Sequence, residues 1–144
     1  MITNNQNTQP STITIPSRTE RLNDVRQFVA QAARLYGFRD EDVNNIMLAV
    51  DEACTNIIKH AYNYSPDESI EVNVGMHGGE FEILIADRGK NFNPNSVPPP
   101  NMKEYMTQYR RGGLGLYLMK KVMDSVDFQF HANRNILRMT KLLH

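Results

Sequence analysis

One long amphipathic stretch, residues 40–62, constrains the fold of this chain more than any other feature. At about 100° per residue, its apolar side chains collect on one side of a helix. They are Val43, Ile46, Met47, Val50, Cys54, Ile57 and Ala61. A helix with so wide an apolar face needs a larger apolar surface to pack on, and a β-sheet offers one. The sequence therefore predicts a central helix on a sheet, with Asp40 as its N-cap.

The opposite side of this helix carries polar side chains, among them Glu52 and Asn56. An acid and an amide at positions i and i+4 project side by side and can reach one ligand. The outer side of any surface helix also carries such residues. From this stretch alone, a ligand site and a solvated surface are both open interpretations.

The residues before the central helix indicate a short strand and a second helix. Residues 12–16 alternate threonine and isoleucine and end in proline, which is typical of an edge strand. A helix is predicted over 20–36, capped by Ser17 or Thr19 and ended by Gly37. Its apolar stripe consists of Leu22, Val25, Phe28, Val29, Ala32, Leu35 and Tyr36.

The second half of the chain predicts two hairpins and one more helix. In order, the expected elements are strands over 70–74 and 81–85, a helix over 117–126, and strands over 127–132 and 136–142. Gly78-Gly79 is the expected turn of the first hairpin, and residues 133–135 form that of the second. Between the hairpins, residues 93–111 show no apolar period. A loop this long inside a domain is usually a functional lid or a disordered segment.

This order of elements predicts an α+β fold, a two-layer α/β sandwich with its helices on one face of a single sheet. The sheet is expected to be mixed and mostly antiparallel. Residues 1–11 are polar and predicted to form a disordered tail, and residues 12–144 are predicted to form one domain.

Composition excludes several functional classes. Sixteen basic and sixteen acidic side chains balance, so no global field favours nucleic acid or a membrane surface. No apolar run approaches the roughly 18 residues of a membrane span, and the polar N-terminus is no signal peptide. The only cysteine, Cys54, lies on the apolar helix face and is expected to be structural. We therefore expect a cytoplasmic protein.

The last predicted helix is preceded by a glycine-rich run, Gly112-Gly113-Leu114-Gly115-Leu116. Glycines allow close approach to the backbone, and the free N–H groups of a helix N-terminus attract phosphate oxygens. Arg110 and Arg111 add positive charge there. The run lacks the Gly-Lys-Ser/Thr ending of a Walker loop, and no strand leads directly into it. Alone it is weak evidence for a phosphate site.

Asp87 lies at the end of a predicted strand, where its carboxylate can accept a hydrogen bond from an exocyclic amine. Gly89 allows the chain to turn tightly beside it. A plain turn-forming Asp-x-Gly is the alternative, because this pattern is common in turns.

In combination, these motifs resemble the N, G1 and G2 boxes of the Bergerat-fold ATPases (the gyrase, histidine-kinase and MutL superfamily). The boxes are Glu52-x-x-x-Asn56, Asp87-x-Gly89-x-x-Phe92 and Gly113-Leu114-Gly115-Leu116. Residues 51–62, 87–94 and 112–126 and the ending Met139-Thr140-Lys141 are similar to the anti-sigma factor serine/threonine-protein kinases. The resemblance covers roughly residues 12–142. It departs from the wider superfamily at Asn91, where many members have a second glycine.

The resemblance implies a role for each motif. Asn56 would coordinate Mg²⁺ bridging the phosphates of ATP, and Glu52 would be the general base. Asp87, with Gly89 beside it, would bind the adenine amine. The remaining nucleotide-binding candidates are Phe92, Arg110, Arg111, Gly112, Gly113, Leu114, Gly115 and Leu116. The two arginines either contact the γ-phosphate or a docked partner, or are solvated charges on the ATP lid at 93–111.

The implied function is that of an ATP-dependent protein serine kinase acting as an anti-sigma factor. It would phosphorylate a small STAS-type antagonist on serine and sequester a sigma factor, as a bacterial, cytoplasmic homodimer that binds neither nucleic acid nor membrane. The alternative is a non-catalytic, nucleotide-gated binding module for a different partner. The intact Glu52 argues against it, because a pure binder needs no base.

Overall fold

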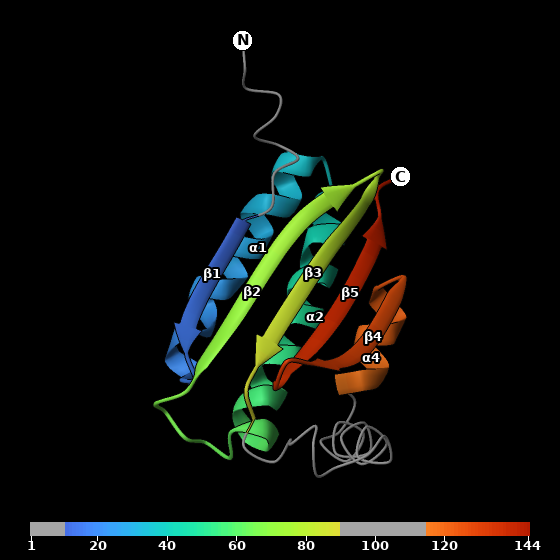
Figure 1. The fold of residues 1–144 in the computed structure, drawn as a ribbon. Helices are drawn as coiled ribbons and strands as arrows, with labels where there is room; N and C mark the ends of the chain where they lie inside the picture. Colours follow the sequence, from blue (N-terminus) through green and yellow to red (C-terminus); the bar gives the residue numbers. More distant parts are fainter. Residues whose placement is uncertain (1–10, 90–114) are drawn as a thin grey trace.

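In the computed structural model, which describes residues 11–89 and 115–144, helices cover one face of a five-stranded sheet (Figure 1). In chain order the elements are β1 (Ser11–Pro16), the 3₁₀ helix η2 (Thr19–Arg21), α1 (Leu22–Tyr36), α2 (Asp40–Asn56), the π-helix η3 (Ile57–Ala61), β2 (Ser69–His77), β3 (Glu80–Asp87), α4 (Gly115–Val122), β4 (Ser125–His131) and β5 (Arg134–Leu142). The predicted α+β sandwich is confirmed. Of the predicted tail, only Ser11 is described, and it begins β1.

The sheet has the strand order β1-β2-β3-β5-β4. All four strand pairs of the described sheet are antiparallel, so the parallel pairing that a mixed sheet implies is absent from this part of the chain. β2 and β3 are joined at Gly78 and Gly79, whose φ angles are 59° and 82°. A two-residue hairpin turn needs positive φ at both positions, and glycine adopts it without strain.

The core lies between the sheet and the helices. β2 and β3 turn every second side chain toward the helices. Six of these apolar side chains are buried, namely Ile70, Val72, Val74, Phe81, Ile83 and Ile85. α2 contacts both α1 and α4, and its apolar side packs into the same cluster. The prediction that residues 40–62 lie on a sheet is therefore confirmed.

The predicted N-caps of the first two helices are wrong. The Ser17 hydroxyl accepts a hydrogen bond from the Glu68 backbone N–H at 3.2 Å and donates to the carbonyl of Ser65, so it joins β1 to the loop before β2. Thr19 begins η2 and caps nothing. Asp40 is the first residue of α2, and no side chain caps that helix. The sequence shows that a residue of a type suited to capping is present, but tertiary contacts decide which backbone group its side chain bonds.

Two further features of the helices differ from what the periodicity of apolar residues predicts. Leu35 was expected on the apolar stripe of α1, but it is 66% exposed. The long helix changes from α to π at Ile57, where the Tyr62 N–H bonds the Ile57 carbonyl at 2.9 Å. Single π turns inside helices often occur at functional sites. The predicted end at Gly37 is confirmed, since Gly37 has φ 107° and bonds the last carbonyls of α1.

The last helix and hairpin are shifted relative to the prediction. α4 begins at Gly115 and ends at Val122, earlier than the expected 117–126. The final turn consists of Ala132 and Asn133, with φ angles of 53° and 65°, and not of residues 133–135. This two-residue turn moves Asn135 out of the loop and into β5.

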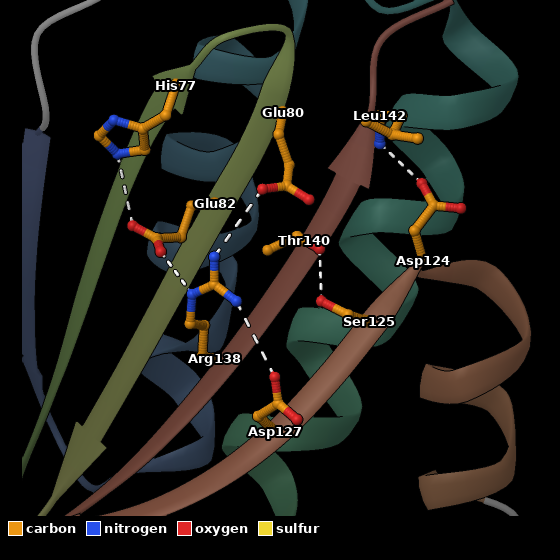
Figure 2. Close-up of polar contacts among 9 residues, drawn as sticks. All are labelled: His77, Glu80, Glu82, Asp124, Ser125, Asp127, Arg138, Thr140 and Leu142. Atoms are coloured by element: carbon orange, nitrogen blue, oxygen red, sulfur yellow. Dashed lines mark hydrogen bonds and ion pairs between the residues drawn. The ribbon is translucent and has the colours of Figure 1, made fainter.

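The other face of the sheet carries charged side chains (Figure 2). The Arg138 guanidinium lies 2.6 Å from Glu82, 3.8 Å from Glu80 and 3.9 Å from Asp127. His77 lies 3.4 Å from Glu82. No described helix covers this face. Because pairs of this kind are solvated and individually weak, they stabilise the sheet only modestly.

Candidate functional site

The parts of the three sequence motifs that the structure describes lie at one end of the sandwich. Figure 1 shows that η3, the end of β3, the beginning of β5 and the beginning of α4 lie together there. Burial is the largest cause that raises the pKa of Cys54 in α2, and the negative charges of Asp51 and then of Asp87, at the end of β3, add to the rise.

Glu52 and Asn56 lie on the last turns of α2, next to the change from α to π. Asn56 is only 5% exposed, and its amide nitrogen Nδ2 has no hydrogen-bond partner. An unpaired buried polar group costs about 1–3 kcal/mol. Glu52 is half-buried one turn earlier. The helix therefore holds a buried amide at a cost in stability, with a carboxylate beside it.

Asp87 is the most buried acid of the described chain, at 3% exposure. Its Oδ1 accepts two hydrogen bonds of 2.8 Å, one from the Gly89 backbone N–H and one from Asn135 Nδ2. Burial raises the pKa of the Asp87 carboxyl, and these two bonds oppose part of the rise. Two donors on one oxygen hold the carboxylate in a single orientation.

Asn135 belongs to this site, and the sequence analysis missed it. It pairs with Asp87 across β3 and β5, and it is 4% exposed. Its Oδ1 has no partner. Among the described residues, the only other buried side-chain polar atom without a partner is Asn56 Nδ2. A two-residue turn at 132–133, recognised in the sequence, would have placed Asn135 in the strand opposite Asp87.

Gly89 lies against the last turn of η3. A Cβ atom at this position would come within 3.0 Å of the Ala61 Cβ and 3.2 Å of the Ala61 carbonyl oxygen. It would also come within 3.1 Å of Asp87 Oδ1. Glycine is therefore required here by space, so that the backbone can approach both the helix and the carboxylate.

Replacing Gly89 with alanine is expected to lower the free energy of unfolding by about 1–3 kcal/mol, because the added methyl group overpacks a fixed backbone. Chemical denaturation measures this change. The double variant with Ala61→Gly removes one of the two clashing methyl groups and is expected to recover part of the loss, with Ala61→Gly alone as the control. Full stability of Gly89→Ala would contradict the steric argument.

Tyr62 ties the site to the sheet. Its hydroxyl donates to the Ser69 carbonyl at 2.6 Å and accepts from the Arg88 backbone N–H at 2.8 Å. Burial raises the pKa of Tyr62 to about 12, so the hydroxyl keeps its proton. The tyrosine therefore fixes the backbone next to Asp87 against the end of η3.

The remaining candidates fall mostly outside the described residues. Phe92, Arg110, Arg111, Gly112, Gly113 and Leu114 lie there, as does the predicted lid at 93–111. Gly115 is the first residue of α4, and Leu116 is buried in the core. Because the Leu116 side chain faces the core, a ligand at this helix start would meet the backbone.

Other chemistries have little support in the described residues. Burial is the main cause that raises the pKa of Cys54 to about 12, so the thiol is protonated and unreactive, as expected from the sequence. No three His, Cys, Asp or Glu side chains gather there as a metal site. None of the helices that the structure describes is long and apolar enough to cross a membrane.

Comparison with known proteins identifies the family to which the chain belongs. The family model of the histidine kinase-like ATPase domain matches residues 15–141. The serine-protein kinase RsbW of Bacillus velezensis is 33% identical over 134 residues, covering 90% of this chain and 83% of that protein. The RsbW of Bacillus subtilis is 30% identical with the same coverage.

Two solved structures share the fold. The RsbU and RsbW domains of a Mycobacterium tuberculosis protein match with a TM-score of 0.68 at 19% identity, over 94% of this chain and 33% of that one. The SiaB–SiaC complex of Pseudomonas aeruginosa matches with a TM-score of 0.66 at 13% identity, over 95% of this chain and 91% of that one. The chain spans about a third of the mycobacterial structure's chain.

The match over residues 15–141 shows that the chain belongs to the family of histidine kinase-like ATPase domains, whose members use ATP. Within it, the relatives at 30–33% identity are serine-protein kinases of the RsbW type. The protein is accordingly a protein serine kinase.

Proposed function

We propose that this kinase acts in a partner switch, as an anti-sigma factor. It transfers the γ-phosphoryl group of ATP to a serine of a small STAS-type antagonist, and it sequesters a sigma factor when the antagonist does not compete. The observation that carries the proposal is the pair at the end of α2, where the amide of Asn56 is buried one turn from the carboxylate of Glu52. The protein works as a homodimer in the bacterial cytoplasm.

The residues at this end of the sandwich suit a nucleotide with its metal. Asp87 presents a fixed carboxylate for the adenine amine, and the Gly89 backbone leaves room beside it. Asn56 offers an amide oxygen, the hard donor that Mg²⁺ prefers. Mg²⁺ keeps most of its water and phosphate ligands, so one protein oxygen is enough, and no acidic cluster is needed. When bound, the metal neutralises charge on the phosphates.

Glu52 acts as the general base in this proposal. It accepts the proton of the attacking serine hydroxyl, whose oxygen forms the new bond to phosphorus as ADP leaves. The phosphates lie at the start of α4, where Gly113, Gly115 and the neighbouring backbone N–H groups hold them. Arg110 and Arg111 contact the γ-phosphate or the docked antagonist.

Phosphoryl transfer in lysate of the source cells tests this function directly. Purified protein and γ-labelled ATP are expected to label one small protein on serine. The Asn56→Ala variant is expected to lose Mg²⁺-dependent ATP affinity by at least about 10-fold, the cost of losing even an outer-shell partner of a metal. The same variant is expected to keep its thermal stability without nucleotide, because it removes an unpaired buried group.

The outcomes separate the alternatives. A labelled small protein with wild type and none with Asn56→Ala supports the kinase and identifies its substrate. Stabilisation by Mg-ATP without any labelled serine would contradict it and indicate the nucleotide-gated binding module. Sequestration is tested by adding the phosphorylated or the unphosphorylated antagonist to a complex of the kinase with a sigma factor. Only the unphosphorylated antagonist is expected to release the sigma factor.

A further inference from the structure

The helix-free face of the sheet has a hollow of about 230 Å³ at the end where β1 and β3 finish and β2 and β5 begin (Figure 1). We call it the strand-end hollow. Its lining includes Thr14, Ser69, Glu71, Ala86, Arg88 and Arg134. The side chains of Thr14, Ser69 and Arg88 are exposed, so the hollow is open to solvent.

The strand register places this hollow on the face away from the helices. Thr14, Glu71 and Ala86 lie in one row across β1, β2 and β3. The residues next to this row along the strands, for example Ile15 and Ile70, are buried in the core. Because successive side chains of a strand point to opposite faces, the row itself points away from the helices. The sheet therefore separates a ligand in this hollow from the candidate nucleotide site.

An ion pair crosses the strand-end hollow. Arg134 of β5 pairs with Glu71 of β2, so the pair passes over β3, which lies between these strands. Ala86 is opposite Glu71 in the register, and its single methyl group leaves room for the crossing. A guanidinium has five N–H donors, more than one carboxylate can use. Since the Arg134 side chain is 33% exposed, it can still donate to a ligand.

Arg88 gives the hollow an excess of positive charge. Within the part of the chain that the structure describes, Arg88 has no ion pair, whereas Arg134 and Arg138 on the same face each have one. The carboxylate of Asp87, next to Arg88 in the chain, is directed to the helix side, where Gly89 and Asn135 bond it. The side chains that face the hollow thus carry two positive charges and, from Glu71, one negative charge.

We propose that the strand-end hollow is a binding site for a small oxyanion of the phosphate class. Arg88 and Arg134 hold the anion with paired N–H groups, the geometry in which guanidinium groups bind phosphate. The hydroxyls of Thr14 and Ser69 donate to its remaining oxygens. The volume is below the roughly 300–1,000 Å³ of pockets for drug-sized ligands, which favours inorganic phosphate over a nucleotide. This inference does not rest on the proposed function.

Inorganic phosphate is the probe, and the methyl resonance of Ala86 in the wild-type protein reports where it binds. Titration with phosphate is expected to shift this resonance until it saturates, whereas sodium chloride at equal ionic strength is expected to leave it in place. Equal shifts with the two salts, or no shift with phosphate, would overturn the inference. A shift confined to the amide of Gly115, at the beginning of α4, would overturn it too, because phosphate would then occupy the candidate nucleotide site.

Two variants are expected to change the phosphate affinity in opposite directions. Arg88→Gln is expected to weaken binding by about 10- to 100-fold, the contribution of hydrogen bonds from a charged donor. Glu71→Gln is expected to strengthen binding by at least about threefold, because it removes a repelling charge and frees donors of Arg134. Neither substitution reaches the core, since Arg88 is exposed and the Glu71 side chain is 45% exposed.

Arg34→Gln is the matched control, because it makes the same substitution at an exposed arginine of α1. It is expected to bind phosphate as the wild type does. Wild-type affinity in Arg88→Gln would overturn the inference. Weaker binding in Glu71→Gln would overturn it as well, because Glu71 would then support the ligand and not repel it.

Discussion

Replacing Glu52 with glutamine is expected to slow phosphoryl transfer to protein serine by about 10²–10⁴-fold, the usual contribution of a general base. Nucleotide affinity is expected to stay within about twofold, because glutamine keeps the shape of the side chain and removes only its basicity. Glu52 is half-buried, one turn from Asn56, so the substitution changes little in the packing. Single-turnover transfer to the purified antagonist measures the rate, and titration with ADP measures the affinity.

Asp51 provides the matched control for this experiment. It is the neighbouring acid on the same helix, and its carboxylate forms an ion pair with Arg26 of α1. Asp51→Asn removes a negative charge at nearly the same place without removing the base, so transfer is expected to remain near the wild-type rate. Equal transfer by Glu52→Gln and wild type would remove the general-base assignment.

Replacing Asp87 with asparagine is expected to weaken ADP binding by about 10- to 100-fold, because a charge-assisted hydrogen bond to the base is lost. The ligand-free protein is expected to become more stable, since a carboxylate whose ionisation is penalised by burial is replaced by a neutral amide. A gain of ~1 kcal/mol corresponds to a rise of about 2–4 °C in Tm for a domain of this size. Titration calorimetry and thermal melting check the two effects, and a drop in Tm without nucleotide would contradict the burial argument.

The effect of Asp87→Asn on stability is expected to depend on pH. The folded-state pKa of Asp87 is raised above its unfolded value, so the protonated form folds more favourably. The stability from this group is present below the unfolded pKa and is lost as the pH rises through the folded pKa. Asp87→Asn is therefore expected to have a higher Tm than wild type at neutral pH. This difference is expected to shrink on acidification, because the wild-type carboxyl becomes neutral too. On acidification the affinity of the wild-type protein for ADP is expected to fall as well, because the protonated carboxyl of Asp87 is a weaker hydrogen-bond acceptor.

Local patterns were enough to predict most of the fold. The two-residue period of residues 70–74 and 81–85 identified β2 and β3, because one face of each strand is buried. The helical period of residues 40–62 placed α2 on the sheet, since its apolar side had to be covered. Gly37 and Gly78-Gly79 marked a helix end and a turn correctly, because positive φ is a local property of the backbone. These features depend on residues that are adjacent in the chain, so they can be predicted from the sequence.

Residue type and spacing, together with the resemblance to the N and G1 boxes, identified Glu52, Asn56, Asp87 and Gly89 as site candidates. Their roles remain proposals. The sequence contained no sign that Asn56 would be buried with an unpaired nitrogen, because a helical period placed it on the polar side. That burial results from the packing at the end of α2, where the change to a π-helix begins.

Sequence alone determined which segments form strands and helices and which residue types line the candidate site, because these depend on periodicity and on local backbone preference. Only the tertiary structure decided that Asn135 faces Asp87. The two residues are 48 positions apart, and strand register brings them together through β3 and β5. Register depends on the two-residue turn at Ala132 and Asn133, and moving that turn by one residue would send Asn135 to the other face of the sheet. The hydrogen bond from Asn135 to the buried Asp87 carboxylate is thus a consequence of pairing between strands that are distant in the sequence, and no local sequence pattern predicts it.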